Sequence, residues 1–93
     1  MKKEVEAMMP YNKRTWLNSE NSPSTGLVVA FDGETTWHGE KIRNTFLQVS
    51  DCNFSARLHK CEDDSMYDFI RKMRLLASEV QKFADYLEAT ERL

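Results

Sequence analysis

The chain is poor in glycine, proline, cysteine and histidine. Its 93 residues include three Gly, two Pro, two Cys and two His. The glycines stand singly at positions 26, 33 and 39, which is typical of turns and not of a Gly-rich phosphate-binding loop. Two histidines leave few bases to activate a Ser or Cys nucleophile, so we do not expect an enzyme.

Long apolar runs are also absent. No run approaches the length of about eighteen residues that a transmembrane helix needs, so we expect no membrane partner. Near the N-terminus, Glu4 and Glu6 interrupt any apolar core of the signal-peptide type. The sequence therefore predicts a cytoplasmic protein with two free thiols.

Neither sign of charge dominates. Thirteen Lys and Arg stand against fifteen Asp and Glu, which gives a net charge of −2. A protein that binds by neutralising many phosphates is usually more basic, so nucleic-acid binding would have to come from a local patch. The hydrophobic content of 41%, with five Phe, three Tyr and two Trp, predicts a small compact domain and argues against disorder.

The order of patterns along the chain predicts one α+β domain over residues 1–93. We expect three segments: an N-terminal arm and polar loop at 1–25, a β-meander at 26–61 and a long helix at 64–92. The meander would be antiparallel, with about four short strands, and the helix would pack on one sheet face. For residues 1–9 the pattern fits a strand and a helical turn almost equally well.

Two hairpins are predicted within the meander. In the first, the apolar run 27–31 is followed by Asp32-Gly33, a dipeptide typical of a hairpin turn, and by a return strand at 34–37. A further turn at 38–40 leads to the second hairpin, residues 42–50 and 54–60. If Asp51 faces Phe54, one register separates a buried apolar side from a polar-aromatic side. The predicted pairs are Val49–Ala56 and Leu47–Leu58 on the apolar side, and Ser50–Ser55, Gln48–Arg57 and Phe46–His59 on the other.

The C-terminal third has the spacing of an amphipathic helix. Apolar residues recur at alternating intervals of four and three, which places them along one stripe. The stripe contains Phe69, Met73, Leu76, Val80, Phe83 and Leu87. Ser65, with Asp68 three residues on, resembles a capping box, and Asp64 is an equally good cap.

The predicted helix is longer than the strands beside it, so part of its stripe needs another cover. A second copy of the chain, the N-terminal arm and a different protein are the three candidates, and we favour the second copy. Ala77 and Ala84 beside the stripe would allow a second helix to approach closely. The predicted dimer interface is Met73, Leu76, Val80, Phe83 and Leu87.

Two surfaces are candidates for partner binding. Aromatic and cationic residues interleave on the polar-aromatic side of the sheet, an arrangement that can bind single-stranded nucleic acid by stacking, or a protein. A second aromatic and basic cluster lies in the N-terminal arm. The candidate residues are Trp37, Phe46, Gln48, Arg57 and His59 on the sheet, and Tyr11, Arg14 and Trp16 in the arm.

No cofactor is expected. The predicted meander brings His38, His59 and Cys61 toward one edge, and His and Cys are acceptable zinc ligands. The spacing matches no specific zinc motif, so the three residues are only weak zinc candidates. His59 and Cys61 as a thiol–imidazole pair are a further alternative, for which a surface histidine beside a structural cysteine is the simpler interpretation.

The predicted order of elements over residues 27–92 resembles that of PC4-like single-stranded-DNA-binding proteins. It consists of four antiparallel strands followed by one long helix. That resemblance implies a dimer that binds DNA on a sheet surface. The size and organisation are also similar to those of small phage or mobile-element inhibitors, anti-CRISPR proteins among them. The hypothesis favoured by the near-neutral charge is a non-enzymatic binder that occludes a partner protein; single-stranded nucleic-acid binding is the alternative.

Overall fold

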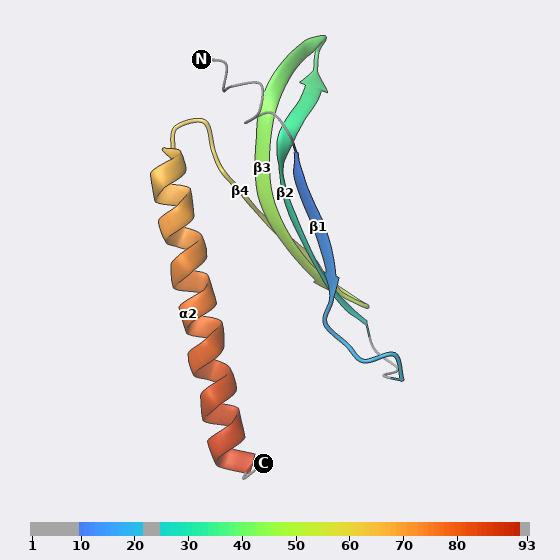
Figure 1. The fold of residues 1–93 in the computed structure, drawn as a ribbon, viewed down its shortest axis with the longest axis vertical. Coiled ribbons are helices and arrows are strands. Elements are labelled where there is room, and N and C mark those ends of the chain that lie inside the picture. The colour runs from blue at the N-terminus through green and yellow to red at the C-terminus, as the bar shows by residue number, and fades with distance from the viewer. Residues whose placement is uncertain (1–9, 22–24, 92–93) are drawn as a thin grey trace. The chain divides into compact units, whose positions relative to one another are not determined.

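The computed structural model describes residues 10–21 and 25–91. The chain forms two compact units that divide between Lys60 and Cys61, and each is described here by itself. Four antiparallel strands are followed by one helix, which confirms the predicted α+β arrangement (Figure 1). Packing of the helix on one sheet face, within a single domain of residues 1–93, stays a prediction. The strand-or-helix alternative for residues 1–9 falls outside the described residues.

The first unit is an open sheet with the strand order β1-β2-β3-β4. Its strands are β1 (Tyr11–Trp16), β2 (Gly26–Trp37), β3 (Glu40–Asp51) and β4 (Ser55–His59). The meander thus begins at Tyr11, and the prediction of an arm separate from the sheet is wrong for residues 11–16. All six side chains of β1 are exposed, and its sequence, YNKRTW, has no alternation of apolar and polar residues that would predict a strand. It forms because its backbone pairs with β2 from Tyr11–Asp32 to Trp16–Leu27.

The prediction of a hairpin turn at Asp32-Gly33 is also wrong. Strand β2 continues through both residues, and they pair with Thr45 and Asn44 of β3. Asp32 is held in the sheet by hydrogen bonds from the side chains of Arg43 and Thr45. Gly33 is buried, and a Cβ there would lie 3.1 Å from the ring of Phe31, so glycine makes room for that ring.

The turn between β2 and β3 is at His38-Gly39, within the predicted turn at 38–40. Both residues have positive φ, 53° and 83°, and Trp37 pairs with Glu40 across them. Positive φ at both central residues is the geometry of a type I′ hairpin, which glycine adopts without strain. The distal part of this hairpin extends beyond β1 and β4 (Figure 1).

The predicted register of the second hairpin is confirmed in all five pairs, from Phe46–His59 to Ser50–Ser55. Its turn is fixed by Asp51, whose backbone N–H donates to the Phe54 carbonyl at 2.9 Å. The Asp51 carboxylate accepts hydrogen bonds from the backbone N–H groups of Phe54 and Asn53, both at 2.9 Å. These two bonds lower the pKa of Asp51.

Within the sheet unit by itself, low exposure does not follow the predicted apolar side, and burial of that side by the helix stays a prediction. On the apolar side, Val49 and Leu58 are 42% and 39% exposed. On the polar-aromatic side, Val29 is only 8% exposed and is the buried apolar side chain of the sheet. The register places Val29 in one row with Arg14, Gln48 and Arg57, so the long side chains beside it belong to polar residues that a hydrophobicity pattern does not count.

The second unit contains the helix α2 (Met66–Glu91). Its N-cap is Ser65: the Asp68 backbone N–H donates to Ser65 Oγ at 3.0 Å, and the Phe69 N–H donates to the Ser65 carbonyl at 3.1 Å. The helix therefore starts where the capping-box pattern predicts, and Asp64 is not the cap. Phe69 is the buried residue of α2.

Ser65→Ala is expected to reduce the free energy of unfolding of α2 by about 1 kcal/mol, because it removes the acceptor of an otherwise unpaired N–H. Chemical denaturation followed by circular dichroism at 222 nm measures this change. Ser78→Ala, on the exposed surface of the same helix, is the control and is expected to leave stability unchanged or slightly raised. Equal stability of Ser65→Ala and wild type would contradict the cap.

Candidate interaction site on the aromatic face

Side chains from all four strands meet on the face that contains Val29. We call it the aromatic face. The ladder pairs place its residues in three neighbouring rows across the sheet. Around Val29 they include Arg14 and Trp16 from β1, Phe31 from β2, Phe46 and Gln48 from β3, and Arg57 and His59 from β4.

The centre of the aromatic face is a stack of three rings. Phe31 and Phe46 have ring centroids 5.4 Å apart with an interplanar angle of 26°. Phe46 and His59 are 5.5 Å apart with an angle of 29°. Because the three residues belong to β2, β3 and β4 in that order, Phe46 has an aromatic neighbour on each side.

Arg57 completes this stack. Its guanidinium carbon lies 3.9 Å from the centroid of the Phe46 ring, in cation–π geometry. Its Nε donates to Gln48 Oε1 at 2.8 Å, so the neighbouring amide fixes the orientation of the guanidinium. Arg57 and His59 are both exposed, and the face thus presents an ordered cation beside aromatic rings.

Most of the residues predicted for partner binding lie together on this face. Phe46, Gln48, Arg57 and His59 are in contact through the interactions above. Residues Arg14 and Trp16 of the predicted arm join the same face as part of β1.

Two predicted partner-binding residues lie elsewhere. Tyr11 pairs with Asp32 and therefore belongs to the opposite face. Trp37 shares the parity of Phe31 but lies six residues further along β2, about 20 Å away at the rise of a strand. Its indole is 63% exposed and contacts His38 edge-on at 4.8 Å. Trp37 therefore lies apart from the aromatic face, at the hairpin end.

Phe31 is the site residue that sequence reasoning missed. The mistaken turn at Asp32-Gly33 ended its strand and left Phe31 without a partner on β3. The pattern that could have identified this pairing is the turn at His38-Gly39. Extending both strands backwards from Trp37–Glu40 pairs Phe31 with Phe46.

The expected grouping of zinc candidates is not supported by the sheet. His59 pairs with Phe46, whereas His38 lies beyond Glu40 at the hairpin turn. Six residues of β3 separate Phe46 from Glu40, so the two histidines are about 20 Å apart by strand rise. Within residues 10–21 and 25–91, no three His, Cys, Asp or Glu side chains form a group that could hold a metal ion.

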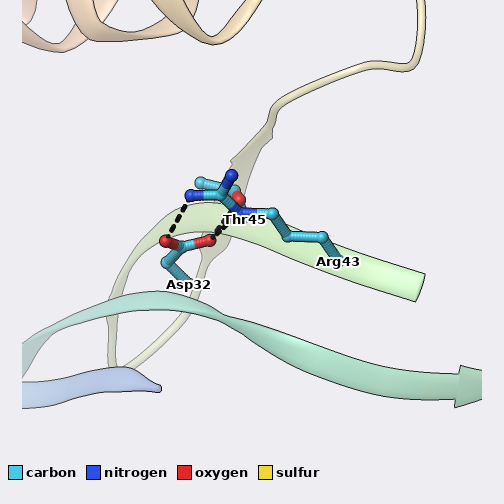
Figure 2. A network of polar contacts seen from close by, with 3 residues as sticks. All are labelled: Asp32, Arg43 and Thr45. Atoms are coloured by element: carbon cyan, nitrogen blue, oxygen red, sulfur yellow. Dashed lines mark hydrogen bonds and ion pairs between the residues drawn. The ribbon is translucent and has the colours of Figure 1, made fainter. Parts of the chain in front are cut away.

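The opposite face carries a polar network at one end (Figure 2). Arg43 donates to both oxygens of the Asp32 carboxylate, from Nε at 2.9 Å and from Nη2 at 2.8 Å. Thr45 Oγ1 donates to the same carboxylate at 2.7 Å. The hydrogen bond from Arg43 is the main reason that the pKa of Asp32 is lowered.

This lowered pKa predicts an acid-dependent loss of stability. The ionised Asp32 stabilises the folded sheet above the ordinary carboxyl pKa of 3.8, and the contribution is lost as the pH falls through the lower pKa of the folded state. Asp32→Asn is therefore expected to unfold more easily than wild type at pH 6, by up to about 1 kcal/mol for a partly exposed pair. Thermal melts at pH 6 and pH 2.5 test this, and a difference that does not shrink at pH 2.5 would contradict it.

A hollow of about 670 Å³ lies at the end of the sheet that holds the β3–β4 turn. Cys52 lines it as a free, exposed thiol. The sulfur accepts a hydrogen bond from the Thr25 backbone N–H at 3.4 Å, and the Thr25 hydroxyl lies at the same distance. Bonding to Thr25 lowers the pKa of Cys52. None of the described residues that line the hollow is a histidine, so this thiol has no imidazole beside it.

The apolar stripe of α2 is the third surface feature. Val80, Phe83 and Leu87 are 58%, 62% and 42% exposed, whereas Met73 and Leu76 are partly buried. Large apolar side chains at helical spacing rarely remain open to water over several turns. The predicted dimer residues therefore form a continuous apolar surface on the helix.

The described part of the chain contains no helix with the length and apolar character needed to cross a membrane. Comparisons of the chain with protein-family models, curated proteins and solved structures found no match.

Proposed function

We propose that this protein is a small non-enzymatic binder that occludes the surface of a partner protein in the cytosol. The proposed contact surface is the aromatic face. The observation that carries the proposal is the closed stack of Phe31, Phe46 and His59 with Arg57 over the central ring. Such a binder would act as small phage or mobile-element inhibitors do, by covering a working surface of another protein.

The composition of the face supports a protein partner. Aromatic residues and arginine are enriched at protein–protein interfaces and supply most of their binding energy. Arg14 and Trp16 extend the face onto β1, and Trp16 is 65% exposed. Because the Arg57 guanidinium is already held by Gln48 and Phe46, binding would order few additional torsions there.

The neighbours of Phe46 make the central ring itself a poor stacking site for a nucleic-acid base. A base binds an aromatic platform by stacking on a free ring face. Phe46 has Phe31 and His59 on its two sides and the Arg57 guanidinium over its ring, so a base would have to displace one of them to stack on Phe46. The net charge of −2 gives no general attraction to phosphates.

Two adjacent residues of β1 provide a matched test. Arg14 lies on the aromatic face, while Lys13 pairs with Ala30 and lies on the opposite face. Both are exposed, and replacing either with Glu changes the net charge equally. Arg14→Glu is expected to weaken partner binding about tenfold, a loss typical of a charge reversal at an interface arginine, and Lys13→Glu is expected to leave it unchanged.

The measurement is quantitative co-purification from extracts of the source cells, with wild type and both variants as bait. A protein retained by wild type and Lys13→Glu but lost with Arg14→Glu identifies the partner and the face together. A protein retained equally by all three would show that the aromatic face is not the contact surface. Capture of RNA or DNA in place of protein would overturn the proposal in favour of nucleic-acid binding.

A further inference from the structure

We infer that α2 pairs with α2 of a second copy of this chain in antiparallel orientation. The apolar stripe alone does not determine the orientation, because two stripes can pack together in parallel or in antiparallel direction. Two other features of the helix favour the antiparallel orientation: the distribution of charge along its length and the direction of its dipole.

The two halves of α2 carry opposite charge. Residues 66–78 contain three cations, Arg71, Lys72 and Arg74, and one carboxylate, Asp68. Residues 79–91 contain one cation, Lys82, and four carboxylates. In an antiparallel pair each cationic half lies beside the acidic half of the other copy, whereas a parallel pair in register places like charges together.

The dipole of the helix accounts for only part of this distribution. Carboxylates are favourable near the positive N-terminus and cations near the C-terminus. The first turn of α2 contains the carboxylate of Asp68, as the dipole favours, but the last described turn contains no basic residue. Stability of an isolated helix therefore does not account for the carboxylates of the C-terminal half. An antiparallel neighbour does, because its dipole and its charged half are both reversed.

Residues beside the stripe fit the same arrangement. Lys72 and Glu79 flank the stripe on one side at a seven-residue interval, close enough to a second helix to feel its charge. Ala77 and Ala84 flank it on the other side, where their small side chains permit close approach.

Spin-label distances test the orientation. In a background with Cys52→Ser and Cys61→Ser, a single label is placed at Tyr67→Cys or at Ala89→Cys, two exposed sites that carry no charge. These sites are separated by about 33 Å along the helix at 1.5 Å per residue. In an antiparallel pair whose centre lies between the two sites, the axial components of the 67–67 and 89–89 distances add to about 65 Å, so at least one of the two distances is long. In a parallel pair both are short, near the helix spacing of about 10 Å plus the label.

Native mass and its salt dependence complete the test. A dimer of the 10.9 kDa chain is expected, and it is expected to weaken several-fold as the salt rises, because attractive charge pairs are screened. Two short label distances, a dimer that strengthens with salt, or a monomer at micromolar concentration would each overturn the inference. Arg14→Glu is expected to leave the dimer intact, so failure here and failure of the aromatic-face proposal are distinguishable.

Discussion

Replacing Val80 and Phe83 with glutamate is expected to convert the proposed α2 dimer into monomers. Both side chains are more than half exposed on the isolated helix, and both become buried in a paired stripe. Each contributes roughly 1.5–3 kcal/mol on full burial, and a two-fold pair buries each one twice. Because about 60% of each side chain remains to be buried, the double variant should lose about 4–7 kcal/mol of association free energy, which weakens the dimer by about 10³–10⁵-fold.

Native mass spectrometry or sedimentation measures this change directly. A control for added charge is Ser78→Glu with Ala89→Glu, which introduces the same two carboxylates outside the stripe. The control is expected to remain dimeric. An unchanged mass for Val80→Glu with Phe83→Glu would show that the apolar stripe is not the dimer interface. A monomeric control would show that added charge alone separates the chains.

Val29→Asp is expected to unfold the sheet unit. Val29 is the buried apolar side chain of the sheet, and a carboxylate there would lose most of its hydration, which pairing with its cross-strand neighbour Arg14 on the exposed strand β1 would offset only in part. The expected cost is several kcal/mol, which is a large part of the roughly 5–15 kcal/mol that stabilises a small domain. Loss of amide dispersion in the ¹⁵N NMR spectrum for residues of β1–β4 would report the unfolding.

The control for Val29→Asp is Val49→Asp. Val49 pairs with Val28 on the opposite face and is 42% exposed, so its carboxylate would keep much of its hydration. The expected cost is below about 1 kcal/mol, as for most exposed substitutions. Equal destabilisation by the two substitutions would contradict the assignment of Val29 as the buried position of the sheet.

The parts of the fold that depend on local patterns were predictable. The β3–β4 register follows from alternation on both strands and from the turn at Asp51, whose carboxylate caps its own turn. The start of α2 follows from Ser65 and Asp68. In each case the residues that decide the structure are neighbours in sequence, so a single sequence contains the whole signal.

The parts that depend on distant partners were not predictable in the same way. Asp32-Gly33 is typical of a turn until Arg43 and Thr45 are placed opposite Asp32. Strand β1 has no apolar alternation, and only the edge of β2 makes it a strand. Both errors affected the site: the first hid Phe31, and the second left Arg14 and Trp16 in an arm separate from Phe46 and Arg57.

The measurement that tests the central claim most directly is a titration of the wild-type protein with a short single-stranded oligonucleotide, at low and at high salt, followed by native mass. Binding of a protein through the closed aromatic stack predicts that the mass is unchanged by oligonucleotide at either salt concentration. The proposal would be contradicted by a complex with the oligonucleotide that forms at low salt, dissociates at high salt and does not form with Arg57→Glu. In that case the aromatic face would bind phosphates and bases.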